Sequence, residues 1–436
     1  MKLNRFWQPK IEKMSWKELE RLQDRRLRSI VKHAYENSVF YRRRFKRDRI
    51  DYESIKSVAD LTKLPLTTKD DLRDNYPFGL LATPLEDVVR IHTSSGTTGN
   101  PTVVLYTRRD LENWSDCIAR CLTMTGVGKG DIFQVILGYG LFTGGLGFHY
   151  GAEKIGATVV PSATGNTRRQ VKLMKDFGVT AFTSIPSYAL YLAEVAQEQG
   201  VDVANDLSVK TISCGAEAWS EAVRKKIEDL FECSVFNSYG LSEAFGPGVA
   251  FECVMQEGLH IWADQFIVEV IDPATCERVE PEEKGEIVLT TLTREAMPLL
   301  RYRTRDIAAI LDIETCECGR SHPKISWIRG RTDDMVKVRG VNIFPSQIEH
   351  VLMNEEGVGN NYQLIITEEK HMDRVKLSIE TAEKIVQEET LRALREKLQR
   401  DLESTLGVNI QIELVEPRSI PRVEGKAQRV LDLRRR

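Results

Sequence analysis

Residues 131–237 alternate between short apolar runs and helical stretches. The apolar runs contain many β-branched residues and are bounded by turn-forming residues, as is typical of buried strands. The predicted strands are Ile132–Leu137, Thr158–Pro161, Ala181–Ser184, Thr211–Cys214 and Val235–Asn237, and the predicted helices are Thr167–Phe177, Tyr188–Gln199 and Ser220–Phe231. This alternation predicts a largely parallel, helix-covered sheet, in which ligands bind beyond the carboxyl ends of the strands.

Other patterns precede and follow this α/β region. Ser15 and Glu18 are spaced as a capping box, which predicts a helix through about Tyr35. The segment Leu61–Asp71 predicts a turn followed by a capped helix. After Phe266, shorter alternating runs predict a small β subdomain. Its expected strands are Ile267–Ile271, Glu286–Leu292 and Ile307–Leu311.

Past Asp333 the pattern changes to a compact α+β unit. Its predicted segments are Glu349–Asn354, Tyr362–Thr367, Val375–Glu380, Glu389–Leu406 and Asn409–Val415. A chain of 436 residues also exceeds a single ordinary hydrophobic core. We therefore expect a large α/β N-terminal domain over residues 1–332, with helix-covered sheets, and a small α+β C-terminal domain over residues 333–436.

Composition excludes several classes of partner. The formal net charge is −3, which gives no nucleic-acid or membrane footprint. No apolar run approaches the roughly 20 residues needed to cross a bilayer. The N-terminus has no apolar core of a signal peptide, and the eight cysteines are scattered. We expect a cytoplasmic protein that binds neither nucleic acid nor membranes.

The segment His92–Thr107 (HTSSGTTGNPTVVLYT) predicts a phosphate-binding loop. It places four hydroxyl residues around two glycines, namely Ser94, Ser95, Thr97, Thr98, Gly96 and Gly99. Backbone N–H groups and hydroxyls in such a turn can hold an anion. A flexible Ser/Gly linker is the alternative, but the loop opens directly into a β-branched run. It lacks the Gly-Lys-Ser/Thr ending of a Walker loop.

Together with five further segments, this loop resembles the adenylate-forming superfamily, and within it the phenylacetate-CoA ligase family. These segments are GYGLFTGGLGFHYGAEKIGATVVP, SYGLSEAFGPGVAFEC, RYRTRDIA, GRTDDMVKVRGVNIFPSQIE and IPRVEGKAQRV. The resemblance spans almost the whole chain, in the expected order. It implies an AMP-forming ligase that uses ATP and Mg²⁺ to activate an aryl, phenylacetate-like acid and then transfers the acyl group to CoA. It is also compatible with a homodimer.

Two other functions are compatible with the same motifs. One is an adenylyltransferase of the same family that moves AMP onto a coenzyme hydroxyl. The other is a non-catalytic nucleotide-binding regulator on the same fold. The intact Lys426, Glu243 and Asp306 argue against the regulator.

The resemblance assigns catalytic roles to Lys426, Glu243 and Thr97. Lys426 would bridge the acyl carboxylate and the α-phosphate, where a compact ammonium suits developing charge. Glu243 would hold Mg²⁺ beside the triphosphate. Without the motifs, a solvated loop lysine and an exposed loop glutamate would be the simpler interpretations.

The resemblance also assigns the nucleotide site. Tyr239 would stack on adenine, and Asp306 would accept both ribose hydroxyls, although its local sequence fits a strand-end turn former equally well. The other implied binding residues are Ser94, Ser95, Gly96, Thr98, Gly99, Gly215, Ala216, Glu217, Asn237, Ser238, Gly240, Leu241, Ser242, Arg331, Asp333 and Gly340.

Asp333 matches a hinge position in the resembled superfamily. Rotation of the C-terminal domain there would remove Lys426 after adenylation and bring in the strand Val338–Gly340 to form the pantetheine tunnel. The segment Phe142–Gly145 would bind the acid, because its glycines leave room for a flat ring. Leu137 stands where many relatives carry tyrosine, so the resemblance implies an aryl acid rather than phenylacetate itself. The alternative is that Leu137 only packs in the hydrophobic core.

A second metal site is predicted from cysteine spacing. Cys316 and Cys318 form a tight pair, and Cys253 and His260 lie in the segment expected to neighbour them. Three thiolates and one imidazole suit a closed, structural Zn²⁺ site. Cys276 or His322 are alternative ligands, and unligated thiols are the alternative to a metal.

Overall fold

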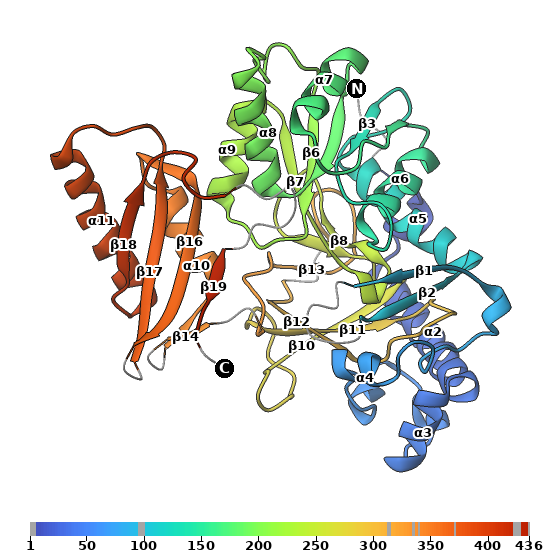
Figure 1. The fold of residues 1–436 in the computed structure, drawn as a ribbon. Helices are drawn as coiled ribbons and strands as arrows, with labels where there is room; N and C mark the ends of the chain where they lie inside the picture. The colour runs from blue at the N-terminus through green and yellow to red at the C-terminus, as the bar shows by residue number, and fades with distance from the viewer. Residues whose placement is uncertain are drawn as a thin grey trace.

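The computed structural model describes residues 6–94, 101–311, 315–333, 336–338, 341–369, 372–421 and 429–434 (Figure 1). Within these residues, the largest sheet has eight strands in the order β13-β9-β8-β7-β6-β5-β3-β4. Their bounds are β3 (Ile132–Val135), β4 (Thr158–Val160), β5 (Ala181–Ser184), β6 (Thr211–Gly215), β7 (Ser234–Leu241), β8 (Gly246–Glu252), β9 (Leu259–Ile261) and β13 (Lys324–Ile325).

Five of the eight strands have the predicted parallel arrangement. Strands β4, β3, β5, β6 and β7 pair in parallel, at the positions expected from the apolar runs. Strands β8, β9 and β13 continue the sheet in antiparallel pairing, which the prediction of a largely parallel sheet missed. The connection from β7 to β8 is only the short helix η4 (Ser242–Ala244), and so short a connection permits antiparallel pairing alone.

Helices cover both faces of the sheet (Figure 1). On one face lie α5 (Arg108–Met124) and α6 (Gly144–Lys154), and on the other lie α7 (Thr167–Phe177), α8 (Pro186–Glu198) and α9 (Glu221–Phe231). Helix α7 has the predicted bounds because Asn166 caps its start and Gly178, with φ +63°, ends it. Helices α5 and α6 pack closely, since a Cβ on Gly151 would lie 2.2 Å from the Ile118 side chain.

The N-terminal segments share a hydrophobic cluster with the large sheet. They comprise α1 (Pro9–Glu12), α2 (Trp16–Asn37), α3 (Val39–Arg47), α4 (Lys69–Asp74) and the antiparallel hairpin β1 (Val88–Thr93) and β2 (Val103–Thr107). Helix α2 begins with the predicted capping box, in which the Ser15 backbone N–H donates to Glu18 at 3.0 Å. Helix α4 is capped by Thr68, as the sequence predicts.

The small β subdomain is an antiparallel sheet of β10 (Phe266–Ile271), β11 (Gly285–Thr291) and β12 (Tyr302–Ala308). The predicted strand Ile307–Leu311 was wrong in position, because β12 begins five residues earlier. The arginines of β12 break the apolar alternation by which a strand is recognised in a sequence. Arg303 lies on the half-buried face and donates to the buried carboxylate of Glu286, while the residues on either side of it are buried.

The C-terminal segments form a hydrophobic cluster of their own, running from Val336 to Ile412. They comprise β14 (Val336–Val338), β15 (Val341–Ile343), α10 (Pro345–Met353), β16 (Val358–Glu369), β17 (Met372–Thr381), α11 (Glu388–Leu406), β18 (Gln411–Val415) and β19 (Val430–Asp432). A sheet in the order β18-β17-β16-β19 lies at one side of the molecule (Figure 1). A domain boundary at residue 333 stays a prediction. Among the described helices, none is long and apolar enough to span a bilayer.

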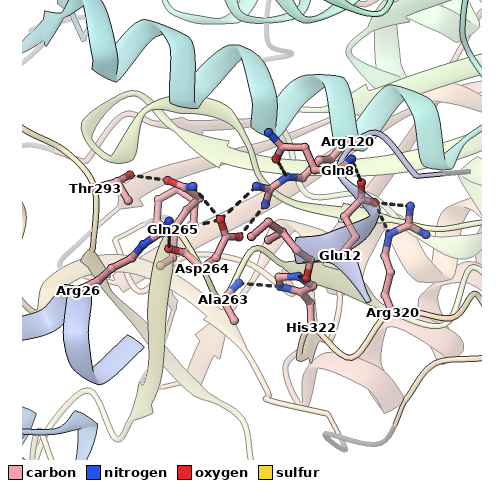
Figure 2. Close-up of polar contacts among 12 residues, drawn as sticks. Gln8, Glu12, Arg26, Arg120, Ala263, Asp264, Gln265, Thr293, Arg320 and His322 are labelled. Atoms are coloured by element: carbon pink, nitrogen blue, oxygen red, sulfur yellow. Dashed lines mark hydrogen bonds and ion pairs between the residues drawn. The ribbon is translucent and has the colours of Figure 1, made fainter. Parts of the chain in front are cut away.

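A buried ion pair ties α5 to the connection between β9 and β10 (Figure 2). The Arg120 guanidinium donates to both carboxylate oxygens of Asp264, at 2.6 and 3.1 Å. The two side chains are 3% and 1% exposed, so neither charge is solvated by water. Gln8 accepts from the same guanidinium at 2.7 Å, which brings the N-terminal segment into the network.

We expect Asp264→Ala to lower the free energy of unfolding by about 3–5 kcal/mol, because it leaves the buried charge of Arg120 unpaired. Denaturant unfolding of the full chain measures this change. The control is Asp176→Ala, which removes a solvent-exposed pair with Lys172 on α7. That variant should change stability by less than about 0.5 kcal/mol, and equal effects of the two variants would contradict the assignment.

Candidate active site

Two cavities lie at the carboxyl ends of the central strands β6 and β7. The first has a volume of about 770 Å³ and the second about 530 Å³. They share wall residues, namely Ala216, Ser238, Gly240 and Leu241. Because β6 and β7 are parallel neighbours, their ends and the following turns meet at one edge of the sheet. A ligand could therefore extend from one cavity into the other.

The first cavity gathers most of the residues expected to bind nucleotide. Ala216, Glu217, Asn237, Ser238, Tyr239, Gly240, Leu241, Asp306, Arg331 and Asp333 line it. They come from three parts of the chain, since β7 lies in the large sheet, β12 in the small sheet, and Arg331 and Asp333 just before β14. Glu217 is held in place by the Ser187 backbone N–H and hydroxyl, at 2.7 and 3.1 Å.

Asp306 lies near the end of β12 and is 5% exposed. One carboxylate oxygen accepts from the Tyr239 hydroxyl at 2.7 Å, and the other accepts from Arg331 at 2.7 Å. Burial raises the pKa of Asp306, and the Arg331 guanidinium opposes that rise. The carboxylate is thus fixed at the cavity wall by two donors, and each oxygen keeps a lone pair for a ligand hydroxyl.

Glu243 lies in η4 and is 6% exposed. Its carboxylate accepts from the Thr102 hydroxyl at 3.3 Å and lies 3.6 Å from the Lys69 ammonium. The Glu243 carbonyl accepts from the fully buried Arg294, whose guanidinium packs between the Tyr106 and Phe245 rings. Glu243 is not among the described residues that line either cavity. Lys69, which lines the first cavity, lies next to its carboxylate.

The base of the predicted phosphate-binding loop lies beside this carboxylate. The hydroxyl oxygens of Thr102 and of Ser94, which follows β1, lie 2.5 Å apart. The Ser94 backbone N–H donates to the Thr102 carbonyl at 3.0 Å, so the end of β1 and the start of β2 lie side by side. The two ends of the loop, at Ser94 and Thr102, therefore lie beside Glu243. The predicted residues Ser95, Gly96, Thr97, Thr98 and Gly99 lie outside the described part of the chain, as do Gly340 and Lys426.

The second cavity has a mainly apolar wall. Its apolar wall residues include Leu137, Phe142, Phe148, Ile185 and Tyr188, and Gly215 and Ser242 also line it. The Ser242 and Thr143 hydroxyls lie 3.0 Å apart at its edge. A Cβ on Gly144 would meet only Leu137, at 3.5 Å, so this glycine leaves space without being required by the backbone.

The predicted metal ligands lie together, apart from both cavities. Cys253, His260, Cys316 and Cys318 place their ligand atoms within 4.8 Å of one another. The neighbourhood arises because β13 pairs with β9 and places Lys324 opposite His260. Neither Cys276 nor His322 joins the group.

Sequence reasoning missed several residues at this site. Lys69, Arg73, Trp219 and Arg305 line the first cavity, and Thr102 and Arg294 position Glu243. Lys69 and Arg73 are spaced i and i+4 on α4, but the predicted segment ended at Asp71 and did not include Arg73. Nothing in the sequence shows that Arg294 is buried, because its partners come from β2 and η4.

Comparison with known proteins agrees with this geometry. The model of the AMP-binding enzyme family matches residues 20–292, and that of the AMP-binding enzyme C-terminal domain matches residues 340–434. The chain belongs to the AMP-binding enzyme family. It is 44% identical to the phenylacetate-coenzyme A ligase of Thermus thermophilus, over 99% of this chain and 100% of that protein. This member of the family is an ATP-dependent, AMP-forming acid–CoA ligase.

Solved structures of 2-hydroxyisobutyryl-CoA ligase resemble this AMP-binding enzyme in fold. A structure of that ligase in the postadenylation state, bound to an acyl-adenylate, superposes with a TM-score of 0.92 at 29% identity, covering 98% of this chain and 92% of that one. The same ligase in its thioester-forming state gives a TM-score of 0.73 at 30% identity, with 99% and 93% coverage.

We expect Lys69→Met to raise the KM for ATP about tenfold, because a half-buried ammonium beside Glu243 contributes about 1–2 kcal/mol to binding the triphosphate. Steady-state pyrophosphate release at varied ATP measures this effect. The control is Lys63→Met, which removes an exposed lysine paired with Asp60. An unchanged KM in Lys69→Met would show that this ammonium does not face the nucleotide.

Proposed function

We propose that this AMP-binding enzyme joins an aryl carboxylic acid to coenzyme A in two steps. The acid's carboxylate oxygen attacks the α-phosphorus of ATP, and pyrophosphate leaves. The thiolate of CoA then attacks the acyl carbon, and AMP leaves with the electron pair of the broken C–O bond. The observation that carries the proposal is the shared wall of a polar and an apolar cavity at the ends of β6 and β7.

The first cavity suits the nucleotide. Asp306 presents fixed carboxylate oxygens to a diol, and Tyr239 presents an aromatic ring held through its hydroxyl. Four cations line the same wall beside four carboxylates, namely Lys69, Arg73, Arg305 and Arg331 with Asp70, Glu217, Asp306 and Asp333. Oriented donors and cations are what an anionic transition state requires.

Mg²⁺ fits the surroundings of Glu243. The carboxylate is nearly buried, so its negative charge favours a cation, and the Lys69 ammonium lies 3.6 Å from it in this structure. We assign Glu243 as the residue that would hold this ion, which would supply charge neutralisation for the leaving pyrophosphate. Thr102 holds the carboxylate in place, and the adjacent loop from Ser94 would bring the hydroxyls of Thr97 and Thr98 to the phosphates. The zinc ion that the sequence also predicts is a separate proposal, because its ligands lie elsewhere.

The second cavity suits an aryl group. Phe142, Phe148 and Tyr188 give it aromatic walls, and Gly144 leaves the breadth that a flat ring needs. Burying a ring there stabilises the bound acid by about 1.5–3 kcal/mol relative to a short acid. The 44% identity to a phenylacetate-coenzyme A ligase supports the same class of substrate.

The arrangement of the C-terminal segments supports a two-state cycle. The chain superposes on the postadenylation state of one relative much better than on its thioester-forming state. Contacts between the two parts include Asn360 donating to Glu194 at 2.9 Å and an ion pair between Arg418 and Glu198. We assign Asp333, which is ion-paired to Arg331, as the hinge between the two states, and Lys426 as the cation of the first step.

We expect pyrophosphate release and CoA-dependent thioester formation to be fastest with aryl acids in a panel of phenylacetate, benzoate, 2-hydroxyisobutyrate and acetate. The kcat/KM of the best aryl acid should exceed that of acetate by at least about tenfold, from the burial of the ring. Adenylation without any CoA-dependent thioester would favour transfer of AMP to a hydroxyl instead. Equal rates with all four acids would contradict an aryl cavity.

One glycine substitution that narrows the second cavity, with a matched control, tests the same assignment. Gly144→Ala adds a methyl group beside Leu137, and should lower kcat/KM for aryl acids more than for acetate. Gly128→Ala is the control, since a Cβ there meets nothing within 4 Å and the residue lines neither cavity.

We expect variants of Lys426 and Asp333 to impair opposite half-reactions. Lys426→Ala should slow acyl-adenylate formation by at least about a hundredfold, while thioester formation from supplied acyl-adenylate continues. Asp333→Pro should slow thioester formation more than adenylation, because proline restricts rotation at this position. Rapid-quench measurement of each half-reaction separates the two effects.

Two controls accompany these variants. Lys384→Ala removes an exposed lysine of the C-terminal segments and should affect neither step. Asp333→Ala removes the ion pair with Arg331 but leaves the backbone free, so it separates loss of charge from loss of rotation. Asp333→Pro with both half-reactions intact would refute the hinge, and Lys426→Ala with normal adenylation would refute the assigned cation.

A further inference from the structure

A buried group of three cysteines and one histidine lies away from both cavities. Cys253 follows β8, His260 lies in β9, and Cys316 and Cys318 lie in the turn before β13. We propose that these four residues bind one structural Zn²⁺ ion, and that the metal holds the turn on which the N-terminal segment docks. Neither claim depends on the acid that the enzyme activates.

The spacing of the ligand atoms fits a single tetrahedral ion. The Cys253 and Cys316 sulfurs are 3.8 Å apart, and the Cys318 sulfur is 3.4 Å from Nε2 of His260. Zinc–sulfur bonds of about 2.3 Å place tetrahedral sulfurs about 3.8 Å apart, and the shorter zinc–nitrogen bond shortens the mixed edge. A disulfide would need a sulfur–sulfur distance of about 2.05 Å. An iron–sulfur cluster, with several iron and sulfide atoms between its ligands, would hold them farther apart.

The histidine is oriented for a metal. Nδ1 of His260 lies 3.0 Å from the His322 carbonyl and donates to it, which leaves the Nε2 lone pair facing the three sulfurs. His322 itself is engaged elsewhere: its Nδ1 accepts from the Ala263 backbone N–H, and its Nε2 faces the Ile11 carbonyl. Cys276 accepts from Arg303 in the small β subdomain. The two alternative ligands are therefore occupied.

One buried cation lies beside the group. Three thiolates and Zn²⁺ leave a net charge of −1 in a buried place, since Cys253 is 1% and His260 0% exposed. Arg320, 1% exposed, donates to the Cys318 sulfur at 3.6 Å, so its positive charge is shared between the group and a second buried anion. The same guanidinium donates to the buried Glu12 carboxylate of α1, at 3.0 and 2.6 Å (Figure 2).

The turn that carries two ligands is thus also the anchor for residues 6–12. Arg320 bonds Glu12 and lies 4.5 Å above the centroid of the Phe6 ring, and His322 faces Ile11. In the described part of this short turn, the Gly319 N–H donates to the Cys316 carbonyl at 2.7 Å and the Cys316 N–H donates to the Arg320 carbonyl at 2.9 Å. Removing a metal cross-link between this turn, β8 and β9 would release the turn, and the N-terminal segment with it.

Metal analysis of the full chain, purified without chelator, tests the first claim. We expect about one zinc ion per chain, and a loss of at least about tenfold in Cys318→Ser. Cys276→Ser is the control, because it removes a half-buried cysteine outside the group. This variant should bind as much zinc as the wild type. In protein prepared with Co²⁺ in place of zinc, the tetrahedral thiolate site should give strong sulfur-to-cobalt absorption that Cys318→Ser lacks.

The measurements on wild-type protein test the metal site even if Cys318→Ser fails to fold. Wild-type protein that holds less than about a tenth of an equivalent of zinc, and that shows no cobalt–thiolate absorption, overturns the metal site. Zinc content of Cys318→Ser equal to that of wild type overturns the assigned ligands.

Limited trypsin digestion tests the second claim. Lys10 and Lys13 are exposed cleavage sites in the anchored segment. We expect cleavage after them to be at least about tenfold faster in Cys318→Ser and in chelated wild type than in zinc-loaded wild type or Cys276→Ser. Equal cleavage of loaded and zinc-free protein would show that the metal does not hold the N-terminal segment.

Discussion

The hydrogen bonds of Asp306 hold the active site together. Its carboxylate lies on β12 of the small sheet, and accepts from Tyr239 on β7 of the large sheet and from Arg331, which precedes β14. Three parts of the chain thus meet at one buried charge, and the first cavity is the space between them. In the proposed function, the wall that the two cavities share would bring the acid's carboxylate and the α-phosphate to the same place.

Much of the fold follows from the sequence. The parallel strands and helix α7 lie where they were predicted, because each strand is an apolar run and α7 carries its own start and stop signals at Asn166 and Gly178. Strands β8 and β9 were not predicted, since their pairing is set by the short connection at η4 rather than by local pattern. Strand β12 was misplaced because Arg303 and Arg305 alternate with buried residues, and their partner Glu286 comes from another strand.

The candidate site was predictable where one motif carries several groups. The stretch Asn237–Ser242 and the turn at Ala216 lie at the cavities, as expected from their places after strands. Residues that act through distant partners were not visible. Arg294 holds the Glu243 backbone, and Thr102 joins that carboxylate to the base of the loop, yet each looks ordinary in its own segment. The Cys/His group was predictable because Cys316 and Cys318 form a tight pair and the segment with Cys253 and His260 was expected to neighbour them.

A crystal structure with a non-hydrolysable acyl-adenylate, an aryl-acyl sulfamoyladenosine, tests the central claim most directly. The account predicts the ribose hydroxyls on Asp306, the adenine beside Tyr239, and the aryl group in the cavity lined by Phe142 and Tyr188, with the acyl linkage at the shared wall. An analogue bound elsewhere, such as in the cavity that Glu194 of α8 and Asn360 of β16 line, would contradict it. So would an analogue whose aryl group turns away from the apolar cavity.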